Sequence, residues 1–489
     1  MADLRSKAEK LYAETPDIVA FMRRGMLAGE VSKLTISRSK GKSVWVYSFD
    51  DKSGIVYVPD DVTTLGAHWS VESRRLITNK RTLIVCGGNN LKAFGAFFLR
   101  SSLTYLDLRD LNCRKVKSLK SAFCDCRWLT NISMPKTGFP KVEEMKYMFK
   151  GCYSLLSIDA SSLNTSLVKD MASVFSNCHS LTKIDLSSWD FSSVEDVSMM
   201  FCRCDQLREV NMKGVPATKL VIGDGMFVSC SELKSVDLFD FSDGGFTDIH
   251  EMFEACYSLN DPRVFSALTS TVTNTSFMFR ECKALQDADL SGASVECVET
   301  AIRMFDNCPK LRSVSFQGLS FASCTDISYM FSDCPELEKI DLTEASFPAV
   351  KTMVEMCSGC GSLKEFSFAA FDVSSVVSFE GAFFGCKSLE RVDFTGFTPV
   401  SVIVLEGMFR NCVSLKEVDI PAFDINAEKC DCTRMFSGCK SLTKLNMGGV
   451  RCKKFVGAGA MLTVGCDLLA EENKHNPQAF LKQPKQLKR

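Results

Sequence analysis

The feature that most constrains this chain is a 26-residue period of the pattern Phe-x-x-Cys-x-x-Leu. Successive copies lie 26 residues apart, except for one 27-residue step and one register in which Cys357 replaces the phenylalanine. The cysteine column is Cys126, Cys152, Cys178, Cys204, Cys230, Cys256, Cys282, Cys308, Cys334, Cys360, Cys386, Cys412 and Cys439. A fixed period of this length predicts a repeat protein, in which each unit stacks only on its neighbours.

One repeat can be written from Leu181, taken as position 1, as LTKIDLSSWDFSSVEDVSMMFCRCDQ. Its apolar residues fall at positions 1, 4, 6, 9, 11, 14, 17, 20, 21 and 24. Positions 4 and 6 have the period of a strand, while the later spacing of three is typical of tight turns or a short 3₁₀ segment. We therefore expect about fourteen units, each with one short strand and an irregular or helical return.

The combination MF-x-x-C-x-x-L-x-x-I-D-L resembles the BspA-type leucine-rich repeats over about residues 94–469. Apolar residues such as Trp189 stand at position 9, where ordinary leucine-rich repeats carry asparagine, and this fits the BspA type. The resemblance implies an α+β repeat protein: a leucine-rich-repeat solenoid whose parallel sheet takes one strand from each repeat. Proteins of this type occur on bacterial surfaces and in large protist families, and are associated with adhesion and protein binding. The resemblance implies no particular site residue.

The two ends of the chain do not repeat. Residues 1–93 predict a small α+β cap module, with helices over 3–13 and 17–28, a hairpin around residues 40–42, and strands at IVYVP and TLIVCG. Residues 94–469 are the expected solenoid, and residues 470–489 form a basic C-terminal tail. The module carries a basic cluster that is either a docking site for an acidic partner or a solvated surface. Its members are Arg23, Arg24, Lys33, Arg38, Lys40 and Lys42.

Composition narrows the class of protein further. The net charge of −1 argues against a nucleic-acid-binding protein, which needs a basic face. The first residues lack the apolar core of a signal peptide, and no run of eighteen or more apolar residues suggests a membrane span. We therefore expect synthesis in the cytoplasm and a final location either there or in an assembled particle. In such a compartment the 24 cysteines should be reduced.

Position 5 is the strand residue between two buried ones, and it is frequently aspartate. A stack of carboxylates is either a site for a basic partner or calcium, or is satisfied by Ser, Thr, Lys and Arg at positions 2 and 3. The candidate partner-binding face consists of Asp107, Asp159, Asp185, Asp237 and Asp289. In the C-terminal half, charges of alternating sign at positions 2 and 3 predict neutralising cross-strand pairs, so that half is expected to be structural.

The sequence offers no convincing catalytic, cofactor or metal site. The cysteine column could store metal or sense redox state, but flanking Phe and Leu indicate buried small hydrophobic side chains. Close cysteine pairs such as Cys430 and Cys432 could suggest zinc, yet they mostly include a member of the column. The four histidines are scattered, and we expect no metal.

These observations predict a non-catalytic scaffold or adhesin-like protein that binds a protein or glycan partner through a long repeat surface. The alternative is a structural component of a large assembly, such as a phage or virus particle or a cytoskeletal array. An enzyme carried by residues 1–93 is the least favoured hypothesis.

Overall fold

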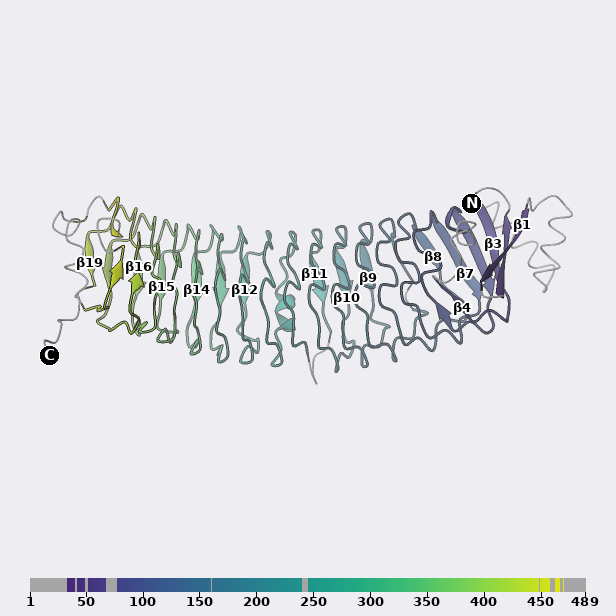
Figure 1. Ribbon diagram of the computed structural model, residues 1–489, viewed down its shortest axis with the longest axis horizontal. Helices are drawn as coiled ribbons and strands as arrows, with labels where there is room; N and C mark the ends of the chain where they lie inside the picture. The colour runs from purple at the N-terminus through teal and green to yellow at the C-terminus, as the bar shows by residue number, and fades with distance from the viewer. Residues whose placement is uncertain are drawn as a thin grey trace. The chain divides into compact units, whose positions relative to one another are not determined.

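The structure is a computed structural model that describes residues 33–39, 42–48, 52–66, 77–159, 161–239, 245–447, 449–457, 462–466 and 469. The described residues fall into two compact units. The first lies within residues 1–194 and 203–205, and the second within residues 195–202 and 206–489. Each unit is a stack of chain turns (Figure 1).

The first unit begins with a sheet in the order β1-β2-β3-β5-β7-β8. Strands β1, β2 and β3 pair antiparallel, whereas β3, β5, β7 and β8 pair in parallel. The sheet therefore continues from residues before position 93 into the first repeats. The strands of this unit are β1 (Lys33–Ser39), β2 (Lys42–Ser48), β3 (Ser53–Val58), β4 (Thr64–Leu65), β5 (Thr82–Gly87), β6 (Ala93–Phe94), β7 (Tyr105–Leu111), β8 (Asn131–Ser133) and β9 (Lys183–Asp185).

In the second unit, three-residue strands recur at positions 3–5 of the repeat and pair in parallel with a register of one whole repeat, as in Ala288 opposite Val314 and Val314 opposite Ile340. One repeat has a 3₁₀ helix, η1 (Pro262–Ala267), in place of the strand. The strands are β10 (Glu209–Asn211), β11 (Ser235–Asp237), β12 (Asp287–Asp289), β13 (Ser313–Ser315), β14 (Lys339–Asp341), β15 (Glu365–Ser367), β16 (Arg391–Asp393), β17 (Glu417–Asp419), β18 (Cys430–Asp431), β19 (Lys444–Asn446) and β20 (Phe455–Val456).

The core consists of side-chain columns, of which the phenylalanines at position 21 are the largest. Neighbouring rings stack nearly parallel with centroids 5.3 Å apart for Phe227 and Phe253, and 5.6 Å apart for Phe253 and Phe279. These rings are fully buried, as are the methionines at position 20. One repeat cannot shield such a ring on both sides, so burial of the column requires stacked neighbours.

The register without phenylalanine is filled in a different way. Cys357 is fully buried at position 21, and the next repeat carries Phe366 at position 4, where most repeats have a smaller residue. The ring of Phe366 lies 4.9 Å from that of Phe383 in an edge-on arrangement. A large side chain elsewhere thus accompanies the small one in the column, as close packing requires.

Each repeat also contains two residues in the left-handed backbone region, at positions 19 and 23. In one repeat these are Met199 and Arg203, with φ of 53° and 58°, and in another Glu251 and Ala255, with φ of 56° and 57°. The N–H groups of positions 17, 19, 21 and 23 donate to carbonyls of the following repeat, as in Phe227 to Met252 at 2.9 Å. This second ladder holds backbone conformations that cost about 1–2 kcal/mol each for residues other than glycine.

The structure confirms the predicted solenoid with one strand per repeat, and the hairpin of β1 and β2. The strands expected at IVYVP and TLIVCG are β3 and β5. The return is built of turns rather than helix. The helices expected over 3–13 and 17–28 and the C-terminal tail lie outside the described residues, and the domain boundaries at 93 and 469 stay predictions.

Candidate binding surfaces and the cysteine column

The cysteine column forms a ladder of thiol donors inside the solenoid. The Sγ of each column cysteine lies near the carbonyl oxygen of position 21 in the preceding repeat, at 3.2 Å for Cys256 and the Phe227 oxygen. The same oxygen accepts the N–H of Cys230 at 3.0 Å. All 24 cysteines are free thiols, and those of the column are fully buried. Burial raises the pKa of Cys126 to about 12 and keeps the thiols of the column protonated. These cysteines are structural hydrogen-bond donors rather than nucleophiles.

Thiol labelling should therefore separate the column from the surface. In the folded chain we expect a maleimide to modify the exposed Cys297 first, and the partly exposed Cys124 and Cys202 more slowly. The column should react about 100-fold more slowly or less, because its thiols become accessible only when repeats open. Peptide mass spectrometry against labelling time measures this order. Cys297→Ser should remove the fast phase, and rapid labelling of Cys256 in folded protein would refute the buried ladder.

The aspartates at position 5 cap the turn that follows each strand. The carboxylate of Asp185 accepts the N–H of Ser187 at 3.0 Å, and that of Asp289 accepts the N–H of Ser291 at 3.0 Å. Asp159 accepts both the N–H and the hydroxyl of Ser161, which lower its pKa. Asparagine and serine at this position make the same contact in other repeats. The local turn thus accounts for short polar side chains at position 5.

Two members of the aspartate column have strong ionic partners. Asp107 is 5% exposed and receives the Nε and Nη2 of Arg109 at 3.0 Å and 2.6 Å. Asp237 pairs with Arg263, which also binds Asp261. Asp159, Asp185 and Asp289 remain on the surface. A partner-binding role for this column stays a prediction.

The other charged regions identified from sequence differ in how far the structure describes them. Lys33, Arg38 and Lys42 lie on β1 and β2, whose backbone alone is described at these positions; Arg23, Arg24 and Lys40 lie outside the described residues. The cross-strand pairs of the C-terminal half are confirmed. They join Lys416 to Glu390 at 2.6 Å, Lys444 to Glu417 at 3.5 Å and Arg391 to Glu365 at 3.8 Å.

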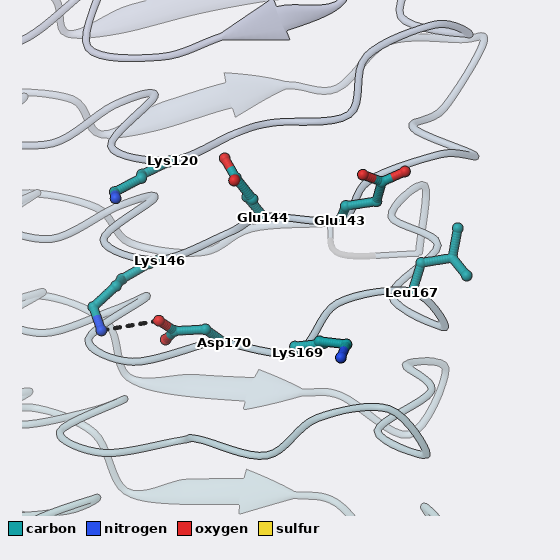
Figure 2. A pocket seen from close by; sticks show the side chains of 7 residues that line it. All are labelled: Lys120, Glu143, Glu144, Lys146, Leu167, Lys169 and Asp170. Atoms are coloured by element: carbon teal, nitrogen blue, oxygen red, sulfur yellow. Dashed lines mark hydrogen bonds and ion pairs between the residues drawn. The ribbon is translucent and has the colours of Figure 1, made fainter.

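An open groove in the first unit is lined by charged residues of opposite sign (Figure 2). Lys146 reaches Asp170 at 2.9 Å, Lys117 holds Glu143 at 2.6 Å, and the Ser118 hydroxyl donates to Glu144 at 2.7 Å. The lining contains three lysines and three carboxylates, which are Lys120, Lys146, Lys169, Glu143, Glu144 and Asp170. With no net charge and its acids already bound, the groove is poorly suited to capture an ion.

A more distinctive surface lies where the cysteine turn leads into the next strand. We call it the aromatic corner and define it as Arg127, Trp128, Tyr153, Leu156 and His179. The Arg127 guanidinium lies 5.3 Å from the ring centroid of Tyr153, and the Tyr153 ring lies 4.8 Å from that of His179. The His179 Nδ1 is 2.8 Å from a carboxylate oxygen of Asp205, which closes the row.

Two residues of the aromatic corner expose large apolar side chains. Trp128 is 62% exposed and Leu156 is 51% exposed. They stand at positions 26 and 2, where other repeats carry polar or small residues such as Ser154 and Thr130. The N–H of Leu156 donates to the Thr130 carbonyl at 3.3 Å, which places Leu156 one repeat above Trp128. Sequence reasoning missed both residues, although the breaks in two polar columns marked them.

The parallel one-strand repeats with a 26-residue register define the class: a leucine-rich-repeat solenoid of the BspA type. The family described as Mycoplasma protein of unknown function, DUF285, matches residues 92–215, 222–343 and 325–447. The chain belongs to this family. A comparison with curated proteins gave no match. Within the described residues, no helix is long and apolar enough to cross a membrane.

Several solved structures are similar to this chain. A leucine-rich repeat protein from Bacteroides ovatus is 17% identical, with a TM-score of 0.48, over 93% of this chain and 98% of the other. A leucine-rich repeat protein from Eubacterium ventriosum is 15% identical, with a TM-score of 0.36, over 94% and 98%. The functional domain of InlJ from Listeria monocytogenes, described as including a cysteine ladder, is 13% identical, with a TM-score of 0.22, over 81% and 65%.

Proposed function

We propose that this chain is a non-catalytic binding scaffold that recognises a protein partner through the aromatic corner of its first unit. The observation that carries the proposal is the exposure of Trp128 and Leu156 at positions that are polar or small in the other repeats. Folding gains nothing from an indole left in water, so burial against a partner is the natural source of its stabilisation. Trp, Tyr and Arg are also the side chains that most often dominate protein interfaces.

The surroundings of the aromatic corner suit a protein interface. The corner leads directly into the strand positions of the same repeats, where Asp159 and Asp185 provide a polar margin. The contacts among Arg127, Tyr153 and His179 hold the rings in place before binding, which lowers the entropy cost of association. An apolar centre with a polar margin is the usual anatomy of such a surface.

Site-specific crosslinking in the cell of origin tests this function. A photoreactive residue replaces Trp128 in the full chain, and a second version carries it at Ile403, an exposed apolar residue of the other unit. We expect one protein to be captured in stoichiometric yield from residue 128 only. If neither position captures a defined protein, the scaffold proposal fails.

The affinity of the captured partner then tests the surface itself. Trp128→Ala combined with Leu156→Ser should weaken binding by about 30-fold or more, because truncation of a central anchor costs about 2 kcal/mol. The matched control, Val377→Ala with Ile403→Ser, also removes exposed apolar side chains and should leave the affinity unchanged. Equal affinity of both double variants would place the binding surface elsewhere.

A further inference from the structure

Two consecutive repeats of the second unit bring together three side chains that can ligate a metal. Asp224 and His250 both occupy position 18 and are 26 residues apart, and Glu251 follows His250. One carboxylate oxygen of each acid and one imidazole nitrogen lie within 4.8 Å of one another. This is the only such group of three among the residues that the structure describes.

The backbone of these residues is fixed by the second ladder. The N–H of Gly223 donates to the Asp248 carbonyl at 2.9 Å, and the N–H of Gly225 donates to the His250 carbonyl at 2.9 Å. The N–H of Glu251 is held in turn by the Ser276 carbonyl at 3.0 Å. Hydrogen bonds on both sides of Asp224 and at Glu251 therefore set the spacing of the three side chains before any ligand arrives.

A carboxylate orients the imidazole. The Oδ1 of Asp248 lies 2.9 Å from the His250 Nδ1 and also accepts the backbone N–H of His250 at 3.1 Å. An acceptor at this distance makes Nδ1 the protonated nitrogen, so the lone pair of Nε2 is available as a ligand. Metal-binding imidazoles are commonly held by a carboxylate on their other nitrogen in this way.

The Oδ1 of Asp224 provides an independent sign that something is bound here. This oxygen is shielded from solvent and accepts no hydrogen bond from the described residues. It nevertheless lies 3.0 Å from the His250 Nε2. With the ring proton on Nδ1, two lone-pair atoms face each other, and a cation between them would satisfy both. Such a buried oxygen is otherwise costly to leave without a partner.

The distances fit a metal ion. Two ligand atoms that are each about 2.1 Å from an ion and 3.0 Å apart subtend an angle of about 90° at that ion. This angle suits adjacent ligands of an octahedral ion that keeps water at its remaining positions. The nitrogen ligand disfavours Ca²⁺ and Mg²⁺, which prefer oxygen, whereas mixed imidazole and carboxylate ligands suit divalent first-row transition metals.

We propose that Asp224, His250 and Glu251 bind one divalent transition metal ion such as Zn²⁺ or Mn²⁺, with water completing its coordination. The two carboxylates neutralise the ion, and because the ligands come from consecutive repeats, the ion links those repeats. The site lies in the second unit and does not rest on the function proposed for the aromatic corner.

Metal titration of the full chain tests the proposal. After treatment with a chelator and its removal, we expect Zn²⁺ and Co²⁺ to bind at one ion per chain by isothermal titration calorimetry. His250→Asn and Glu251→Gln should each abolish this stoichiometric binding. Asp248→Asn, which removes only the group behind the imidazole, should weaken it by about 10–100-fold. The control is His179→Asn, because His179 faces the single carboxylate of Asp205 and should not contribute.

Two further readouts distinguish this site from metal bound by cysteines or at random on the surface. Zn²⁺ should raise the melting temperature of the wild-type chain and of His179→Asn, but not that of Glu251→Gln, whose folded state is checked by circular dichroism. The Co²⁺ spectrum should lack sulfur-to-metal charge transfer. Absence of saturable binding to the wild type, retention of binding in the ligand variants, or a thiolate spectrum would each overturn the proposal.

Discussion

Phe383→Ala is expected to lower the free energy of unfolding of the second unit by about 3–5 kcal/mol. The ring is fully buried, stacks on Phe409 with centroids 5.4 Å apart, and meets Phe366 edge-on. Its removal leaves a cavity beside the register in which Cys357 already replaces the phenylalanine. The ladder bonds on both sides keep the backbone from collapsing into that space.

Phe384→Ala is the matched control, because it removes the same ring from the next residue. Phe384 is 36% exposed and its main ring contact is Arg410 at 5.5 Å, so its loss should cost about 1 kcal/mol or less. Urea unfolding with hydrogen exchange by mass spectrometry measures both changes. Protection should fall first in residues 357–412, since each repeat depends on its neighbours. Equal effects of the two substitutions would argue against the stacked column as the core.

Gly87→Ala is expected to destabilise the first unit by about 2–5 kcal/mol. Gly87 has a φ of 84°, which costs an L-residue about 1–2 kcal/mol. A Cβ there would also lie 2.4 Å from the carbonyl oxygen of Val58. That oxygen accepts the N–H of Gly88 at 2.8 Å and cannot move without breaking the bond, so overpacking adds about 1–3 kcal/mol.

Gly88→Ala separates the two causes. Gly88 has nearly the same φ, 81°, but a Cβ there would meet the end of the Leu111 side chain at 3.0 Å, which can shift. We expect only the dihedral cost of about 1–2 kcal/mol. Thermal denaturation of the two variants provides the comparison. A cost for Gly88→Ala as large as that for Gly87→Ala would mean that the contact with Val58 is not decisive.

The sequence predicted the solenoid because the residues that build its core are the same in nearly every repeat. Phe227 and Cys256 stand in columns whose members face the same neighbours, so composition alone marks them as buried. The left-handed positions could not be predicted in this way. Met199, Glu251 and Ala255 share no side-chain property, because the constraint acts on their backbone and is met by hydrogen bonds from other repeats.

The candidate sites were less accessible for a related reason. The aspartate column was visible, but its pairing with turn N–H groups depends on a local geometry that the pattern does not state. Trp128 and His250 are single departures from their columns, and a search for recurring residues passes over them. The separation of 26 residues between Asp224 and His250 was a usable signal, since equal positions in consecutive repeats must be neighbours.

The thiol ladder has a consequence for how such chains change length. Every thiol of the column donates to the repeat before it, and every bonded carbonyl belongs to the same position. Deletion or duplication of one whole 26-residue period within a unit therefore returns an equivalent acceptor to each donor. Recombination between the repetitive DNA segments that encode neighbouring repeats can add or remove rungs at little cost to folding. Shifts by part of a period leave donors without acceptors and are excluded.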